Sequence, residues 1–382
     1  MAAMKIVWAA NNYWDSPFQV GCNSLAREFA AMGMEIAFLS DPISPFHLLA
    51  SGSKDTFWGR WSTWRAGGKY DLGGKLFYYS PFAPLVPANK PLLRSRAVLD
   101  HWHRLTLPSV TRKVRQAGFG EVDLLIVDTT SQHFWFDAIR HRRSVVRVTD
   151  FAGGFQKSTP ALLSRESDMI RRADVVTYTA RNLRGMVEEA GARKAVYTPN
   201  GINVQHLTRG DRSEPTDMAP MPRPRVIYVG ALEEWFDTGL VRRCALENPG
   251  ASFVIIGPSR TDLSALRDIP NIHLLGARSH SEVARYLWNS DVGIIPFRTS
   301  HPVIKSVHPI KLYEYIACEL PVVSTRWEEL DEIPLEFHKA DNHAGFLSGL
   351  RAALGRGRHP QNLEQFSWRS TAERILQAVS PL

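Results

Sequence analysis

Short apolar runs alternate along the chain with amphipathic stretches, which predicts strands and helices in turn. The run 6–9 predicts a buried strand, residues 19–32 carry apolar side chains at helical spacing, and the run 35–39 predicts a second strand. Strand, helix and strand in this order form a βαβ unit of a parallel sheet. The chain therefore begins as an α/β protein.

The same alternation continues to the end of the chain, with one interruption. Residues 204–224 are polar and rich in proline, which predicts a linker. We therefore expect two doubly wound Rossmann-like domains, residues 1–203 and 225–362, and a helix in the C-terminal segment 363–382. Further strands are predicted at 123–127, 144–148, 175–178, 195–197, 226–229, 253–256, 272–274 and 292–295, and further helices at about 160–172, 180–190, 237–247 and 279–288.

Ligands of such sheets bind beyond the carboxyl ends of the strands. The loop after the first predicted strand holds Asn11, Asn12 and Tyr13, and Asp128 follows the strand predicted at 123–127. We therefore expect these four side chains to lie beside a binding cleft, on its acceptor side.

Residues 308–323 predict a short helix that runs into a short buried strand, because Pro309 suits a first helical turn and Pro321 prevents the helix from continuing. The N–H groups at the amino end of a helix attract anions, and His308 and Lys311 stand there, which favours a phosphate or diphosphate. Glu314 lies on nearly the same face as Lys311 and can accept hydrogen bonds from ribose hydroxyls. This combination indicates a nucleotide site, whereas the simpler interpretation is an amphipathic helix with a solvated Lys and Glu.

The composition limits the possible classes of protein. The 382 residues exceed the usual size of one domain, and the hydrophobic content of 44% excludes extensive disorder. No apolar run reaches the roughly 20 residues of a transmembrane helix, and the first apolar stretch is too short for a signal peptide. The three cysteines lie far apart, which predicts neither a disulfide framework nor a zinc site. We expect a protein of the reducing cytoplasm.

One segment carries the whole positive surplus of the chain. Between Thr56 and Arg115 there are eleven Lys or Arg and two Asp, a net charge of +9, compared with +8 for the full sequence. Basic and aromatic side chains are interleaved there, which suits an anionic membrane surface, where each Lys or Arg is worth ~1 kcal/mol. Nucleic acid, a solvated basic loop and a lid over the acceptor are the alternatives. The residues expected to contact the membrane are Trp58, Arg60, Trp61, Trp64 and Arg65.

Five segments resemble, in order, those of the two-domain (GT-B) nucleotide-sugar glycosyltransferases: 197–203, 228–231, 254–258, 271–276 and 311–323. Within that family they are similar to bacterial polysaccharide-assembly enzymes of the xanthan glucuronosyltransferase and teichuronic-acid types. The resemblance implies an acceptor-binding first domain that faces a donor-binding second domain across a cleft, and a C-terminal helix that crosses back to the first domain. A glycine usual in the last motif is Glu319 here. The donor contacts implied are Gly230, Pro258, Arg260, Arg278, Phe297, His308, Ile310, Lys311, Leu312 and Glu314.

The resemblance also bears on the mechanism. Retaining members of glycosyltransferase family 4 carry the motif E-x7-E, whose second Glu corresponds to Glu314. At the position of the first Glu, eight residues earlier, this chain has Ser306. Inverting enzymes use a general base instead, which takes the proton of the acceptor hydroxyl. In the similar glucuronosyltransferase an Asp after a strand of the first domain has that role, and it maps onto Asp150, with Asp128 and His133 in reserve. The alternative for Asp150 is to cap the turn that follows the strand.

The leading hypothesis is an inverting transferase that moves a sugar, such as glucuronate or another hexose, from a UDP-sugar to a lipid-linked oligosaccharide in exopolysaccharide or cell-surface glycan assembly. Lys311 would neutralise the departing diphosphate, and because no D-x-D motif is present we expect no metal or other cofactor. The expected partners are the donor, the acceptor and the inner face of the cell membrane, to which the protein binds peripherally, but not nucleic acid. The alternatives are a retaining family 4 enzyme, a sugar-nucleotide epimerase, and a non-catalytic nucleotide- or polyanion-binding protein.

Overall fold

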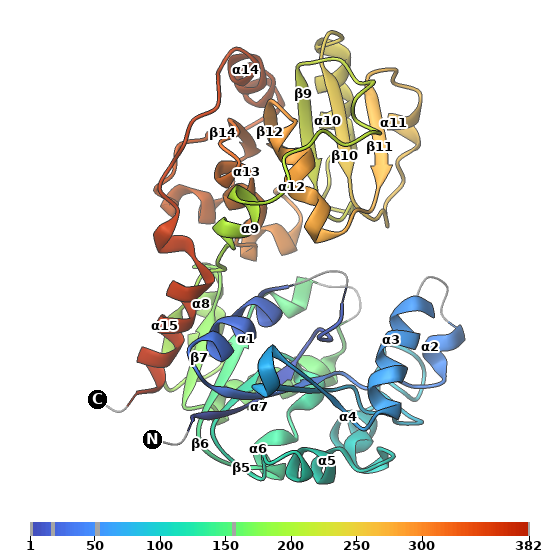
Figure 1. Cartoon of the computed structure of the whole chain (residues 1–382), viewed down its shortest axis with the longest axis vertical. Helices are drawn as coiled ribbons and strands as arrows, with labels where there is room; N and C mark the ends of the chain where they lie inside the picture. Colours follow the sequence, from blue (N-terminus) through green and yellow to red (C-terminus); the bar gives the residue numbers. More distant parts are fainter. Residues whose placement is uncertain (1–2, 17–19, 50–53, 155–157, 381–382) are drawn as a thin grey trace. The chain divides into compact units, whose positions relative to one another are not determined.

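The computed structural model describes residues 3–16, 20–49, 54–154 and 158–380 and contains two compact α/β units (Figure 1). The first unit comprises Met1–Pro199 and Thr371–Leu382, and the second comprises Asn200–Ser370. Residues 204–224, predicted as a linker, lie within the second unit. Three apolar side chains of this stretch, Leu207, Met218 and Met221, are buried in its core. This burial is the reason why a proline-rich stretch does not act as a linker here.

The first unit is built on one eight-stranded sheet. Its strand order is β3-β4-β2-β1-β5-β6-β7-β8, and all neighbours are parallel except β3 and β4. The order of the parallel strands reverses between β1 and β5, which makes the carboxyl ends of these strands the switch point where doubly wound sheets bind ligands. The strands are β1 (Lys5–Ala10), β2 (Glu35–Ser40), β3 (Lys69–Asp71), β4 (Leu76–Tyr79), β5 (Glu121–Val127), β6 (Arg140–Val148), β7 (Val175–Tyr178) and β8 (Ala195–Tyr197).

Helices of the first unit follow the sequence pattern where they connect parallel strands. The longest, α7 (Pro160–Arg172), begins with Pro160 in its first turn, and the Thr159 hydroxyl accepts a hydrogen bond from the backbone N–H of Leu162 (3.3 Å). The helix predicted at 19–32 is α1 (Gly21–Ala31), and residue 19 lies outside the described residues. The other helices are α2 (Phe46–Leu49), α3 (Lys54–Arg65), α4 (Arg96–His101), α5 (Val110–Gln116), α6 (Trp135–Ala138) and α8 (Leu183–Glu189), together with α15 (Trp368–Val379), which begins in the second unit and belongs to the first unit from Thr371 onward.

The second unit has a six-stranded parallel sheet in the order β11-β10-β9-β12-β13-β14. Its switch point lies between β9 and β12. The strands are β9 (Arg225–Val229), β10 (Ser252–Ile256), β11 (Ile272–Gly276), β12 (Val292–Ile295), β13 (Val322–Thr325) and β14 (His338–Ala340). The helices are α9 (Val204–Thr208), α10 (Thr238–Glu247), α11 (Ser264–Arg267), α12 (His280–Trp288), α13 (Ile310–Ala317) and α14 (His343–Leu354). The predicted α/β class and doubly wound architecture are confirmed.

The basic aromatic segment is more ordered than its sequence indicated. It contains α3, α4 and α5 together with β3 and β4 at the edge of the first sheet. Three of its aromatic residues, Phe77, Tyr79 and Trp102, belong to the core of the first unit. Within the described part of the chain, every helix falls short of the length or apolarity needed to cross a bilayer.

Candidate functional site

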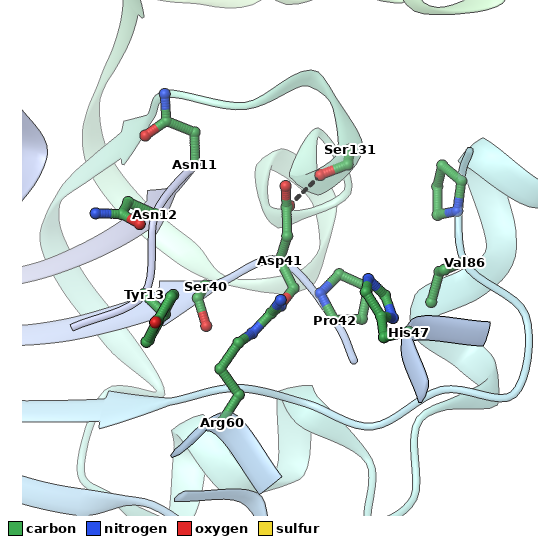
Figure 2. A pocket seen from close by; sticks show the side chains of 11 residues that line it. Asn11, Asn12, Tyr13, Ser40, Asp41, Pro42, His47, Arg60, Val86 and Ser131 are labelled. Atoms are coloured by element: carbon green, nitrogen blue, oxygen red, sulfur yellow. Dashed lines mark hydrogen bonds between the residues drawn. The ribbon is translucent and has the colours of Figure 1, made fainter. Parts of the chain in front are cut away.

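A pocket of about 340 Å³ lies in the first unit at the switch point of its sheet (Figure 2). It is formed by the end of β2, by the segments that follow β1, β2, β4 and β5, and by one side chain from α3. The asparagines and the tyrosine that the sequence placed beside a cleft are part of its wall. The lining residues are Asn11, Asn12, Tyr13, Ser40, Asp41, Pro42, His47, Arg60, Val86, Pro87 and Ser131.

Among the described residues that line this pocket, Asp41 has the one acidic side chain. Its Oδ1 accepts hydrogen bonds from the Ser131 hydroxyl and, at 3.4 Å, from Gln132 Nε2, while its Oδ2 accepts one from Thr129 Oγ1 at 3.5 Å. Burial raises the pKa of Asp41, although these donors and the nearby Arg60 guanidinium oppose the shift. Asp41 was not among the residues expected from the sequence, although its place two residues after the strand predicted at 35–39 was a readable signal.

The position of Arg60 differs from the one expected from the sequence. The sequence assigned it to the membrane surface together with its aromatic neighbours, but its side chain extends from α3 into the pocket, where Nη2 donates to the backbone carbonyl of Asp41 (Figure 2). The guanidinium also lies 5.8 Å from the Tyr13 ring centroid. Helical geometry explains the difference, because residues 58 and 60 are about 200° apart around a helix and cannot share one surface.

Asp128 and Asp150, the two acidic candidates for the base, have different environments. Asp128 forms a buried ion pair with Arg147 (2.9 Å) and accepts a hydrogen bond from Trp8 Nε1 (2.9 Å), with only 1% of its side chain exposed. This places Asp128 in the packing of the sheet rather than on the acceptor side. Asp150 is exposed after β6 and accepts a hydrogen bond from Thr149 Oγ1 (3.2 Å). His133, the third candidate for the base, is buried, and its Nε2 lies 3.2 Å from Asp100 Oδ1.

The second unit brings Lys311 to the switch point of its own sheet. A Cβ added at Gly230, directly after β9, would lie 2.1 Å from Lys311 Cε, so only glycine leaves room for this side chain. A Cβ at Gly257, after β10, would lie 1.9 Å from the Gly230 carbonyl oxygen, which shows how closely the two loops approach. Lys311 Nζ lies 5.7 Å from the Tyr228 ring centroid and 5.6 Å from that of Phe297.

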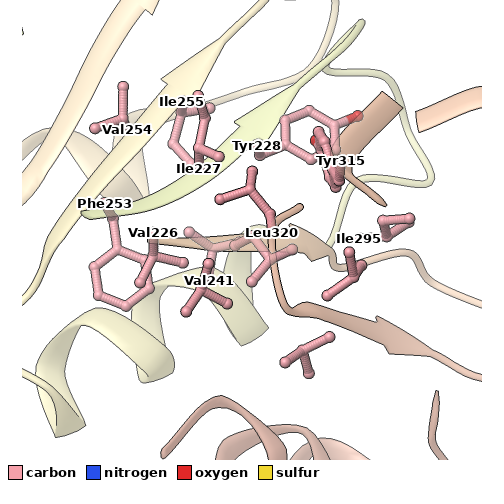
Figure 3. Close-up of a cluster of buried hydrophobic side chains, with 14 of the residues drawn as sticks. Val226, Ile227, Tyr228, Val241, Phe253, Val254, Ile255, Ile295, Tyr315 and Leu320 are labelled. Atoms are coloured by element: carbon pink, nitrogen blue, oxygen red, sulfur yellow. The ribbon is translucent and has the colours of Figure 1, made fainter. Parts of the chain in front are cut away.

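Two tyrosines of the underlying core hold this arrangement in place (Figure 3). The Tyr315 hydroxyl of α13 accepts a hydrogen bond from the backbone N–H of Val229 (2.8 Å), which joins the helix to the end of β9. The Tyr228 hydroxyl donates to the carbonyl of Ala231 (2.9 Å) and shapes the turn that contains Gly230. Lys311 and Gly230 are therefore positioned by the core rather than by flexible loops.

Burial changes the acid–base chemistry of the pair Lys311 and Glu314. It lowers the pKa of Lys311, although the Glu314 carboxylate opposes that shift. It raises the pKa of Glu314 to about 7, and the Lys311 ammonium again opposes the change. Both shifts disfavour the charged forms, and a bound dianion that accepts from Lys311 would favour its charged form. Perturbed groups at a switch point are typical of a ligand site.

Several donor contacts implied by the resemblance have structural partners instead. Arg278 donates to Asp217 (2.6 Å), to the Tyr286 hydroxyl (2.9 Å) and to the Leu275 carbonyl (2.6 Å). His308 is buried, stacks on the Tyr313 ring and lies at hydrogen-bond distance from its hydroxyl (3.0 Å). These two side chains pack within the second unit, where the Arg278 guanidinium and His308 Nε2 have protein partners.

The remaining predicted donor residues differ in how deeply their side chains are buried. Phe297 is buried and Leu312 is fully buried in the core, while Ile310 is half-buried as the first residue of α13. Pro258 and Arg260 are exposed after β10, and Arg260 lies 3.4 Å from Glu233, a residue that the sequence analysis did not consider. Across the described ranges no group of three or more His, Cys, Asp or Glu could hold a metal ion.

Comparisons with known proteins divide the chain as the fold does. Residues 8–179 match the family described as glucuronosyltransferase GumK, N-terminal domain, and residues 223–347 match glycosyl transferases group 1. The chain is 26% identical over 205 residues to TuaH of Bacillus subtilis, named for teichuronic acid biosynthesis. That similarity covers 50% of this chain and 51% of TuaH, so it extends over about half the length of each.

Solved structures with the same fold align over almost the whole chain. Sucrose-phosphate synthase from Thermosynechococcus elongatus is 14% identical, with a TM-score of 0.66 and 98% of each chain covered. HepE of Anabaena, solved with UDP and glucose, is 14% identical, with a TM-score of 0.61 and coverage of 99% and 100%. At this identity the likeness establishes the fold alone. The two family matches therefore assign residues 8–179 to the GumK N-terminal domain family and residues 223–347 to the glycosyl transferases group 1 family, on a GT-B fold.

Proposed function

We propose that the protein transfers a sugar from a UDP-sugar to a lipid-linked glycan during polysaccharide assembly. The observation that carries the donor part is Lys311, held over Gly230 at the amino end of α13 and at the switch point of the second sheet. Helix N–H groups and a desolvated ammonium form a site for a diphosphate. Glu314 is available for the ribose hydroxyls. The uridine part is supported by HepE, which was solved with UDP and glucose.

The proposed reaction inverts the anomeric carbon. The acceptor hydroxyl oxygen forms a bond to that carbon as the bond to the diphosphate oxygen breaks, and UDP leaves with the electron pair. The hydroxyl proton passes to the Asp150 carboxylate, and Lys311 with the helix amino end stabilises the charge that develops on the diphosphate. Asp150 is the better base of the two aspartates because its carboxylate is exposed, whereas that of Asp128 is occupied by Arg147.

The exposed surface of the first unit supports a membrane-bound acceptor. Among the described residues, six of the eleven large hydrophobic side chains that are exposed lie between Trp58 and Leu107. Leu92 is the extreme case, since it is 86% exposed and has a left-handed backbone with φ 68°. The rings of Trp61 and Trp64 pack against each other, with their centroids 4.4 Å apart, and against Phe82, so these two residues contribute less to the exposed surface than the sequence indicated. We define the lipid-facing patch as Trp58, Leu85, Leu92, Leu105, Leu107 and the exposed Arg65, Lys90, Arg94 and Arg104.

The donor site is tested by thermal shift with UDP and a panel of UDP-, GDP- and ADP-sugars. A ligand that binds only the folded state stabilises it by about 2.7 kcal/mol at a hundred times Kd. We expect one UDP-sugar to raise the melting temperature of the wild type. This rise should be lost in Lys311→Met and in Gly230→Ala, whose new Cβ displaces Lys311. Gly250→Ala, with no heavy atom within 4 Å of the added Cβ, is the matched control. No stabilisation by any nucleotide would favour a non-catalytic polyanion-binding protein.

Asp150→Asn tests the base separately. It should retain the thermal shift with the donor and lose transfer, because only the proton acceptor has been removed. NMR of the product decides the stereochemistry, and retention of configuration would instead support the family 4 mechanism. Conversion of the donor without any acceptor would indicate an epimerase.

A further inference from the structure

The pocket of Figure 2 contains polar groups that the donor chemistry does not use. Behind these groups, the buried side chain of Gln132 connects the ends of β1 and β2. Its Nε2 donates to the carbonyls of Ala10 (3.2 Å) and Leu39 (3.0 Å). The same nitrogen reaches Asp41, and Gln132 Oε1 accepts from Trp135 Nε1 (3.0 Å). The Asp41 carboxylate is therefore held by a buried network rather than by a loop alone.

Asp41 retains the capacity to accept a further hydrogen bond. A carboxylate offers about four lone-pair positions. Among the described residues, Ser131 and Gln132 donate to Oδ1, and Thr129 alone donates to Oδ2. Arg60 uses the backbone carbonyl of Asp41 rather than the carboxylate. A ligand hydroxyl can therefore donate to Oδ2 without displacing a protein group.

The charges of the pocket favour a neutral guest. Arg60 and Asp41 contribute one charge of each sign, and burial together with Arg60 lowers the pKa of His47, which keeps its imidazole neutral. The amides of Asn11 and Asn12 add donors and acceptors of no net charge. A phosphate would meet the Asp41 carboxylate at close range, whereas a ring of hydroxyl groups finds both donors and acceptors.

The shape of the pocket agrees with a sugar ring. Its volume of about 340 Å³ falls within the ~300–1,000 Å³ of small-molecule pockets. The Tyr13 ring, Val86 and two prolines provide apolar surface for the C–H faces of a pyranose. From α3, Arg60 extends into the pocket, whereas Trp58, two residues earlier, is 56% exposed on another face of the same helix. The helix α3 therefore contributes one side chain to the pocket and another to the lipid-facing patch.

We propose that this pocket binds one uncharged sugar residue of the acceptor glycan, and that Asp41 determines its specificity by accepting hydrogen bonds from the sugar hydroxyls. This inference rests on the proposed function for the identity of the ligand as an acceptor. The binding of a sugar here is independent of the donor site and can be tested without turnover.

Saturation-transfer NMR with methyl glycosides of glucose, mannose and galactose, and with cellobiose, tests binding directly. We expect transfer to at least one of these sugars in the wild type and its loss in Asp41→Asn. Tyr13→Ala should also weaken sugar binding, although this variant leaves the hydrogen bonds of Asp41 intact. It therefore tests the pocket even if Asp41→Asn misfolds. The signal should persist in Lys311→Met and in Asp268→Asn, an exposed carboxylate of the second unit. Binding unchanged by Asp41→Asn and Tyr13→Ala, or no sugar binding at all, would overturn the proposal, as would binding of inorganic pyrophosphate in place of sugars.

Kinetics with a lipid-linked acceptor provide the second test. Asp41→Asn should raise the KM for the acceptor about tenfold or more and leave the KM for the donor unchanged. An equal rise of the KM values for donor and acceptor would indicate a structural role for Asp41 and would contradict its assignment to acceptor binding. If the wild type binds no nucleotide sugar but binds a glycoside through Asp41, the proposed function fails and the pocket remains a sugar site.

Discussion

Glu314 illustrates how burial changes the chemistry of one residue. Its pKa of about 7 in the folded protein lies above the ordinary value of 4.5, so the folded state holds this proton more tightly than the unfolded state does. The carboxylate therefore lowers stability progressively as the pH rises from about 4.5 to about 7, and the full penalty applies above that range. Under the proposed function, the ionised form of Glu314 is the better acceptor for ribose hydroxyls, which offsets this cost.

We predict that Glu314→Gln is more stable than the wild type at about pH 8 and that this gain disappears below about pH 4.5, where both chains carry a neutral group. Melting temperatures of both proteins across this range provide the measurement. The variant should at the same time bind UDP more weakly, a common exchange of function for stability. A stability difference that is constant with pH, or that grows in acid, would show that the carboxylate is not responsible.

At the scale of elements, the end of α13 explains the unusual residue in the last sequence motif. The backbone N–H of Leu320 donates to the carbonyl of Tyr315 (3.0 Å) and that of Glu319 to the carbonyl of Ile316 (2.9 Å), the two hydrogen bonds of a Schellman motif. Glu319 occupies the position that normally requires glycine and has φ 60°. The turn is therefore the one expected from the motif, formed here by a residue that is strained in it.

Glu319→Gly should raise the free energy of unfolding by up to about 1 kcal/mol, because a left-handed conformation costs an L-residue roughly 1–2 kcal/mol and part of the gain is lost to the greater freedom of glycine in the unfolded chain. Glu319→Ala is the matched control, since it removes the same carboxylate and keeps the strain. Urea unfolding of the three proteins distinguishes these cases. Equal stabilisation by Ala and Gly would assign the effect to the charge of Glu319 instead.

At the scale of the whole molecule, the lipid-facing patch predicts where the protein meets a bilayer. The double variant Trp58→Ala with Leu92→Ser should bind anionic vesicles at least about tenfold more weakly, because each buried apolar side chain contributes about 1.5–3 kcal/mol. Co-sedimentation with vesicles of phosphatidylglycerol and phosphatidylcholine measures this. Leu246→Ser changes an exposed leucine of the second unit and should have no effect. An equal loss of vesicle binding in the Leu246→Ser control, or no loss in the double variant, would show that the lipid-facing patch does not bind the membrane.

The periodicity of apolar residues determined most of the architecture on its own. Parallel strands buried on both faces, such as β10, form continuous apolar runs that are visible without any tertiary information. The Lys311 to Val323 stretch was likewise readable, because a helix start, its charges and its stop are all local in sequence. The edge strands β3 and β14 and the short strand β4 beside β3 were missed, since short strands are defined by pairing with a neighbour rather than by their own sequence pattern.

Other features depended on contacts between residues far apart in the chain. The sequence could place Asp128 and Asp150 at strand ends, but only the fold pairs Asp128 with Arg147 and leaves Asp150 exposed. It could count the basic residues of the aromatic segment, but only the fold turns Arg60 inward to Asp41. Local patterns determine secondary structure, because helices and strands repeat along the chain. The direction in which a single charged side chain points is decided by packing between elements, which no local pattern encodes.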